Sequence, residues 1–330
     1  MWLPSPRGPI TTWLFAELVT APHALDEAPP FSPESPLADD DLQLALFACY
    51  ELHYQGFEDV DDLWEWNASL LGLRARLEER FAAHLADVIP PPPAVPVEDT
   101  PQALVELISS QDEGASIAIF LHRTADLDQF REFVVHRSLY HLKEADPHTW
   151  AIPRLRGPAK AALVEIQADE YGGGRVCRMH SELFRATMRS LGLDDSYGAY
   201  ADRVPAITLA VGNAMSMFGL HRRHRGALLG HLAALELTSS LPNHRYSQGL
   251  RRLGGDAAAR RFYDEHVQAD AVHEQIAVND MCGAFAVAHP DLAGDVLYGA
   301  ACAVTLDRLF AEHVMRLWGS GRTSLRAGAG

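Results

Sequence analysis

Apolar residues recur every three or four positions along most of the chain, which is the spacing of one face of an α-helix. This pattern predicts a succession of helices after residue 125, over 126–144, 154–171, 175–191, 203–221, 223–240, 256–288 and 292–318. The alternation that is typical of a strand is limited to the short run SIAIFL. We therefore expect an all-α protein, built as a multi-helix bundle.

The first part of the chain follows a different pattern. Residues 1–40 are rich in proline, serine and acidic residues and are expected to be extended or loosely packed. Two amphipathic helices should follow, one over DLQLALFACYELHYQGF and one that begins near Asn67.

A proline-rich linker is expected at residues 89–101, because the string IPPPPAVPVEDT favours stiff polyproline II and blocks helix. Thr100 and Pro101 then look like the cap and first residue of a new helix, PQALVELISS. The linker divides the chain into a helical N-terminal extension, residues 1–95, and a core, residues 96–325.

The composition narrows the possible partners. Of the 330 residues 48% are hydrophobic and 22% charged, which is ordinary for a soluble globular protein. The net charge of −16 argues against nucleic acid or an anionic membrane as partner, because both bind basic surfaces.

No apolar run reaches the roughly 18 residues of a membrane span, and prolines interrupt the start of the chain where a signal peptide needs an apolar core. The four cysteines are scattered without a CxxC pair, so we expect a cytoplasmic protein with reduced thiols.

Candidate metal ligands stand on one predicted helix, where His266, Asp270 and His273 occupy positions i, i+4 and i+7. At about 100° per residue their side chains fall within roughly 60° of one another. Two imidazoles and a carboxylate on one stripe suit iron, manganese or zinc. The same spacing alone also fits a surface network on an amphipathic helix, so the prediction depends on ligands from other helices.

Three further side chains can complete such a site. Glu170 and His180 lie in ALVEIQADEYGGGRVCRMHSELF, and Glu236 lies among apolar residues in RGALLGHLAALELTSSLP. A carboxylate in apolar surroundings is costly unless it is paired or bound to a cation. Together with the stripe these residues offer three imidazoles and three carboxylates, a set that suits two metal ions bridged by a carboxylate.

The surroundings of these ligands contain other candidates. Three consecutive glycines between Glu170 and His180 indicate either a helix–loop–helix junction or a close backbone approach to substrate or O2. Glu165 is either an additional ligand or proton-handling group, or a solvated helix residue. The residues that we expect in a substrate pocket are Tyr171, Gly173, Met217, Tyr246 and Arg251.

The order of these residues resembles that of the heme-oxygenase-like diiron oxidases, a family of iron-containing redox enzymes. Its elements are a Glu, a His about ten residues later, a lone Glu and then HxxxDxxH, and the resemblance covers roughly residues 100–320, with EYGGGR and HVQADAVH as its most specific parts. It implies a heme-oxygenase-type bundle, O2 as cosubstrate, an external electron donor and dimer contacts through residues 1–90. It also implies two iron ions held by Glu170, His180, Glu236, His266, Asp270 and His273.

The expected function is therefore that of an O2-dependent, non-heme diiron oxidoreductase of secondary metabolism. Its substrate would be small and amino-acid-derived or otherwise nitrogenous, and its reaction N-oxygenation or oxidative C–C cleavage. Alternatives are oxidative decarboxylation of a fatty acid at the same site and a cofactorless or non-redox enzyme of the same fold. A ferritin-like diiron bundle would carry Glu-x-x-His pairs, which the sequence lacks. A metal store would bind metal without consuming O2.

Overall fold

The computed structural model describes residues 1–32, 34–110 and 116–327, except for the side chains of residues 268–272. The described residues form helices and no strand, which confirms the predicted all-α class. The helices around the site are α6 (Leu127–His141), α8 (Gly157–Glu170), α9 (His180–Ser190), α11 (Arg225–Arg252), α12 (Ala257–Gln275) and α14 (Ala293–Gly319). The other α-helices are α1 (Pro9–Leu18), α2 (Asp40–Glu51), α3 (Ala68–Val88), α4 (Thr100–Ser109), α5 (Ile117–Arg123), α7 (Asp146–Thr149), α10 (Ala206–Leu220) and α13 (Ala284–Ala288).

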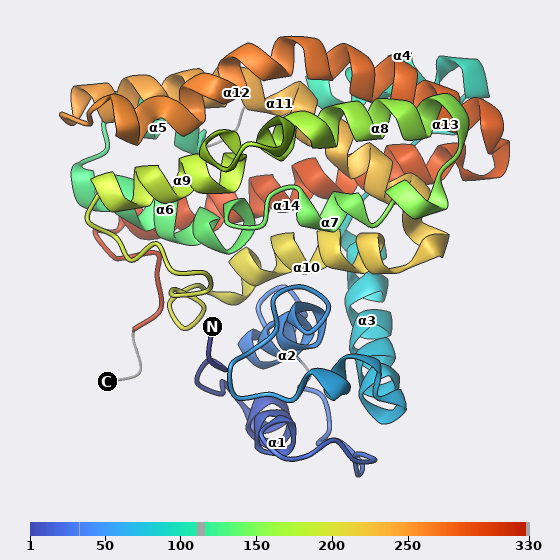
Figure 1. Cartoon of the computed structure of the whole chain (residues 1–330), viewed down its shortest axis with the longest axis vertical. Coiled ribbons are helices and arrows are strands. Elements are labelled where there is room, and N and C mark those ends of the chain that lie inside the picture. Colours follow the sequence, from blue (N-terminus) through green and yellow to red (C-terminus); the bar gives the residue numbers. More distant parts are fainter. Residues whose placement is uncertain (33, 111–115, 328–330) are drawn as a thin grey trace.

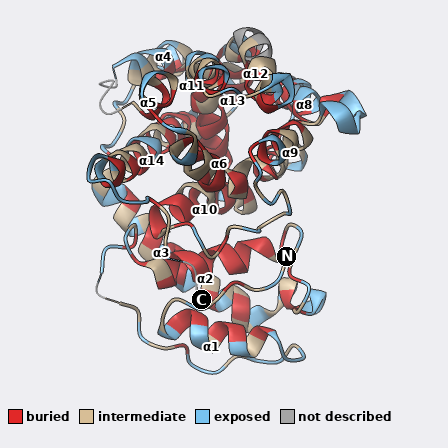
Figure 2. Cartoon of the chain, turned by 90° about the vertical axis from the view of Figure 1, so that its left-hand side faces the viewer, coloured by how far each residue is buried: buried red, intermediate tan, exposed pale blue. Residues whose placement is uncertain are grey.

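The helices form an upper body and a lower lobe (Figure 1). In the upper body α11 packs against α14, α12 and α5, and α9 packs against α12. Below them α10 packs against α2, which forms the lower lobe together with α1 and α3 (Figure 1). Buried residues line the facing sides of the helices in both parts (Figure 2). Among the described residues, no helix has the length and apolar character needed to cross a membrane.

Two glycines allow α11 and α14 to lie unusually close together. A Cβ atom on Gly230 of α11 would stand 1.7 Å from the carbonyl oxygen of Val296 on α14. In the same way, a Cβ atom on Gly299 of α14 would stand 1.9 Å from the carbonyl oxygen of Ala227. Any larger side chain would therefore separate the two helices, one of which carries Glu236.

Two expectations about local structure were wrong. Residues 1–40 were expected to be extended or loosely packed, but they contain α1, which has five buried residues. The first turn of α1 is capped from α2, because the Asp41 carboxylate accepts hydrogen bonds from the backbone N–H groups of Ile10 and Thr11, both at 2.8 Å. The run SIAIFL is not a strand but lies in α5, where the Ser116 hydroxyl accepts a hydrogen bond from the N–H of Ile119 at 3.3 Å. A short apolar run fits a buried helix as well as a buried strand, and α5 packs against α11.

Two of the predicted helices have different boundaries in the structure. The segment 256–288 forms α12, a π-helix over Ile276–Gly283, and α13. π-Helical segments are rare overall, but those that occur are often found at functional sites. This one packs against α8. The helix predicted over 223–240 continues through Pro242 to Arg252 as α11.

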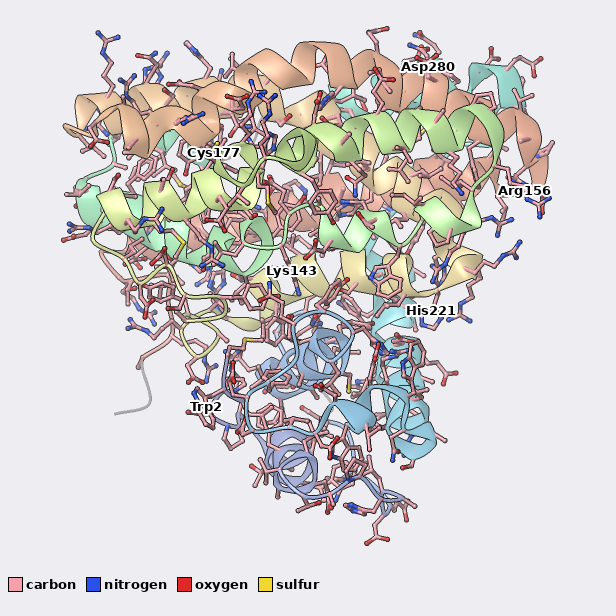
Figure 3. All side chains as sticks on the ribbon, viewed as in Figure 1. Trp2, Lys143, Arg156, Cys177, His221 and Asp280 are labelled. Atoms are coloured by element: carbon pink, nitrogen blue, oxygen red, sulfur yellow. The ribbon has the colours of Figure 1, made fainter. Side chains whose placement is uncertain are left out.

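A buried ion pair connects the lower lobe to the upper body. The Lys143 ammonium lies 2.6 Å from the carboxylate of Glu51, the last residue of α2, and both side chains are buried. The Tyr197 hydroxyl donates a further hydrogen bond to Glu51, and the Lys143 nitrogen lies 4.2 Å from the centre of the Tyr54 ring. Figure 3 shows Lys143 between the upper helices and the lobe. The domain division at residue 95 stays a prediction, but the two parts share this polar contact.

We predict that Glu51→Gln destabilises the protein strongly. The substitution leaves the buried Lys143 ammonium without its charge partner, which should lower the free energy of unfolding by about 3 kcal/mol. Denaturant unfolding followed by circular dichroism measures this change. Glu312→Gln is the control, because the Arg308–Glu312 pair is about half exposed and its loss should cost less than about 1 kcal/mol. Equal effects of the two substitutions would contradict a structural role for the Glu51–Lys143 pair.

Candidate metal centre

Glu170 and His180 meet because the chain reverses between α8 and α9. Glu170 is the last residue of α8 and His180 the first of α9, and Gly172, Gly173 and Gly174 all have positive φ between them. A Cβ atom on Gly172 would stand 2.5 Å from the backbone carbon of Arg178, so only glycine fits this turn. The glycines thus form the helix–loop–helix junction, and they bring the His180 Nδ1 atom to 2.8 Å from the Glu170 Oε2 atom.

Four buried side chains form a first donor group: Glu144, Glu170, His180 and His266, whose donor atoms all lie within 4.8 Å of one another. His266 lies on α12, and its Nδ1–H donates to the Phe262 carbonyl oxygen at 2.8 Å. This hydrogen bond leaves Nε2, 3.6 Å from Glu144 Oε1, as the nitrogen that would bind a metal. Glu144 follows the end of α6, where His141 Nδ1 lies 2.7 Å from its Oε1 atom.

A second donor group consists of Glu170, Glu236 and His273, which are all buried and again lie within 4.8 Å of one another. His273 Nε2 lies 3.1 Å from the Asp169 carboxylate, which holds the proton on that nitrogen. His273 Nδ1 therefore faces inward, 3.5 Å from Glu236 Oε2. Such carboxylate–histidine contacts orient metal-binding imidazoles in many proteins. Glu170 belongs to both groups.

The unused hydrogen-bonding atoms of these residues fit metal binding. Among the described residues, Glu144 Oε2, Glu170 Oε2, His180 Nδ1 and His273 Nδ1 are buried and make no contact with the geometry of a hydrogen bond. The close polar contacts of Glu170 Oε2, His180 Nδ1 and His273 Nδ1 are with other members of the donor groups. Polar atoms without a partner are rare in protein interiors and call for a missing ion or water. All four belong to the donor groups, and carboxylate with imidazole is a common donor set for iron.

The charges of the site also fit the binding of a metal ion. Burial alone would lower the pKa of His273, but Glu236 and Asp169 raise it to about 9. Burial also opposes protonation of His180, yet Glu170 raises its pKa above the usual value. The carboxylates thus attract positive charge into the site. A bound cation would displace these protons, because a ligating imidazole nitrogen must be unprotonated.

A cavity of about 350 Å³ opens beside both donor groups. Its walls come from α6, α11, α12 and α14, and they include the carboxylates of Glu144, Glu170 and Glu236 and the ring of His266. Phe133, Leu232 and other apolar residues also line the cavity. The cavity gives a small molecule access to the metal side of the site.

The structure brings most of the predicted ligands together. Glu170, His180, Glu236, His266 and His273 all belong to the two donor groups. The side chain of Asp270 lies outside the described residues. Glu165 is exposed on α8 and belongs to neither group of described residues, so the structure does not support it as an additional ligand.

The predicted pocket residues have mixed outcomes. Tyr246 lines the cavity, whereas Tyr171, Gly173, Met217 and Arg251 are absent from its lining. The Tyr171 hydroxyl donates to Asp146 at 2.7 Å, and Met217 is buried in α10. Gly173 is exposed in the glycine loop, and Arg251 is exposed near the end of α11.

Glu144 is the donor that the sequence reasoning missed. It lies beyond the last turn of α6, so helical spacing does not relate it to the other ligands. One signal was available: LKEADP puts two charged residues directly after an apolar helical stretch. A charged pair at such a position must be exposed or partnered, and both residues are buried here.

The comparison with known families agrees with this geometry. Residues 131–308 match the model of a family described as iron-containing redox enzymes. The match includes every residue of the two donor groups and more than half of the chain. The chain belongs to the iron-containing redox enzyme family. Its all-helical structure therefore has the heme-oxygenase-like fold that the ligand order implied.

One curated relative adds chemical context. This iron-containing redox enzyme is similar to a nitrosourea synthase of Streptomyces achromogenes subsp. streptozoticus, with 28% identity over 153 residues. The similar region covers 46% of this chain and 32% of the relative. The chain thus corresponds to about a third of that protein's length.

We predict that Glu144→Ala lowers the metal content of the protein, whereas Glu165→Ala does not. Glu144 supplies a buried carboxylate to the first donor group, and Glu165 is exposed. Removal of the Glu144 carboxylate should cost at least one equivalent of bound iron or weaken iron binding at least about tenfold. Anaerobic loading with Fe(II), removal of free iron and elemental analysis measure this difference. Iron loss in Glu165→Ala together with full iron content in Glu144→Ala would show that the donor assignment is wrong.

Proposed function

We propose that this chain is an O2-activating, non-heme diiron oxidoreductase that acts on a small substrate. The observation that carries the proposal is the pair of buried donor groups that share Glu170. A shared carboxylate is the arrangement by which one site holds two ions close together. We include Asp270 as a further ligand, because its position on the His266–His273 stripe is that of a ligand in the resemblance.

Two iron ions held there would supply the reduction of O2 coupled to oxidation of the substrate, with electrons from an external donor. The residues of the chain fix where this takes place. Glu144, His180 and His266 surround one side of Glu170, and Glu236 and His273 the other. The Phe262 carbonyl and the Asp169 carboxylate hold the imidazoles of His266 and His273 in the ligating orientation.

Two tyrosines that line the cavity keep their hydroxyl groups neutral. Burial, reinforced by neighbouring Glu144, raises the pKa of Tyr140 well above its usual value. Burial, with nearby Tyr246, does the same for the pKa of Tyr263. Both hydroxyls therefore stay protonated at neutral pH, and they can donate hydrogen bonds to a substrate without adding negative charge beside the donors.

We propose a nitrogenous, amino-acid-derived substrate and a reaction of N-oxygenation or oxidative C–C cleavage. The similarity to a nitrosourea synthase, whose name denotes a product with oxidised nitrogen, supports this choice. The cavity of about 350 Å³ suits a small molecule of this class. We further propose a cytoplasmic homodimer that works in secondary metabolism, with residues 1–95 as its helical extension.

The proposal predicts O2 consumption that depends on bound iron. Anaerobic protein with two equivalents of Fe(II) should consume O2 when mixed with aerated buffer, as measured with an oxygen electrode and by absorbance. His266→Ala should abolish most of this consumption, because it removes a donor of the first group. His313→Ala is the control, since this residue lies on α14 outside both donor groups. Iron binding without O2 consumption beyond that of free Fe(II) would indicate a metal store instead.

A further inference from the structure

The lining of the cavity contains charged residues in addition to the metal donors. On α6, Arg137 lies one turn, about 6 Å, before His141. The His141 Nδ1 atom in turn lies 2.7 Å from the Oε1 atom of Glu144. On α11 a stripe of lining residues runs from Glu236 through Asn243 to Tyr246. Arg137 and Asp307 of α14 also line the cavity, and we call this pair the far end of its lining. A ligand that fills the cavity can therefore touch both the metal donors and the far end.

Arg137 is held in a defined position at this far end. Its Nη2 atom lies 2.6 Å from Asp307 Oδ1. Its guanidinium carbon lies 4.7 Å from the centre of the Phe310 ring and 5.5 Å from that of Phe133. A guanidinium has five N–H donors, so a single contact with Asp307 leaves others for a ligand. The aromatic rings fix the plane of the group in advance, which reduces the entropic cost of binding.

The charges at this end come in matched pairs. Both arginines that line the cavity are paired with acids, Arg137 with Asp307 and Arg308 with Glu312. A lone carboxylate, such as the head group of a fatty acid, would be attracted by Arg137 but repelled by Asp307. A head group with both charges can give its carboxylate to the arginine and its ammonium to the aspartate, and Asp307 is 58% exposed and thus accessible.

A third polar residue lines the same cavity. Tyr263 is on α12, three residues before His266, and its side chain is 1% exposed. Tyr263 lines the cavity, and its buried hydroxyl has no hydrogen-bond partner among the described residues. A buried hydroxyl of this kind is normally satisfied. It can donate to a polar atom in the middle or reacting part of a bound ligand.

We propose that Arg137 and Asp307 form the head-group site for a zwitterionic α-amino acid, whose long side chain extends past Tyr263 to the metal donors. The α-carboxylate binds the Arg137 guanidinium, and the α-ammonium binds the Asp307 carboxylate. The inference rests on the proposed function in one respect: the tip of the amino-acid side chain, next to the metal donors, is the part that reacts. It favours an amino acid over a fatty acid as the substrate class.

The test measures binding without turnover. Calorimetry on Zn(II)-loaded protein compares L-lysine with cadaverine, which lacks the carboxylate, and with 6-aminohexanoate, which lacks the α-ammonium. The wild-type protein should bind L-lysine at least roughly tenfold more tightly than either analogue, because each head-group charge makes a charge-assisted hydrogen bond. Octanoate should bind more weakly than L-lysine.

Substitutions assign each preference to a residue. Arg137→Gln should remove the preference over cadaverine, and Asp307→Asn should remove the preference over 6-aminohexanoate. Arg131→Gln is the matched control, because Arg131 lies on the same helix in a partly exposed pair with Asp128 and should change neither preference. Circular dichroism confirms folding, and the two head-group variants test the proposal separately.

Several outcomes overturn the proposal. It fails if L-lysine does not bind, if the analogues or octanoate bind as tightly, or if both preferences survive in Arg137→Gln and Asp307→Asn. Because Zn(II) is redox-inert, these results do not depend on O2 chemistry. Intact head-group selectivity without O2 consumption would contradict the proposed function and leave the head-group site supported.

Discussion

The structure is organised around the burial of three carboxylates in one place. Glu144, Glu170 and Glu236 are all less than a tenth exposed, and each belongs to a donor group with imidazole nitrogen. Burial of this much negative charge is unfavourable unless cations compensate it. The raised pKa values of His180 and His273 show that the site attracts positive charge, and two metal ions would supply it without protons on the ligating nitrogens. Glu170 is central because it lies in both donor groups.

The surrounding fold meets the geometric demands of this site. The glycine loop after α8 reverses the chain, so that Glu170 and His180 meet although they lie on different helices. Close packing of α11 on α14 through Gly230 and Gly299 fixes the helix that carries Glu236. Lys143 is the neighbour of Glu144 in the sequence and is bound to Glu51 of the lower lobe. The N-terminal helices are thus connected to the turn that supplies a donor, which gives them a structural role beyond any dimer contact.

The sequence was most informative where spacing along one helix determines geometry. His266 and His273 could be assigned to one face of α12 from their numbers alone, and the ligand order then indicated Glu170, His180 and Glu236. Glu144 could not be found in this way, because it lies in a turn whose position depends on the packing of α6 and α7. The same reason applies to Arg137 and Asp307, which are 170 residues apart and meet only in the folded protein. The misassigned run SIAIFL shows that a short apolar segment takes its conformation from its neighbours, here α11.

The account requires that the two donor groups hold two ions bridged by Glu170. Anomalous diffraction from crystals grown anaerobically with Fe(II), collected on both sides of the iron absorption edge, tests this requirement most directly. We expect two iron peaks about 3.5–4 Å apart, one beside Glu144, His180 and His266 and the other beside Glu236 and His273, with the Glu170 carboxylate in contact with both. A single peak, or iron bound away from Glu170, would contradict the account.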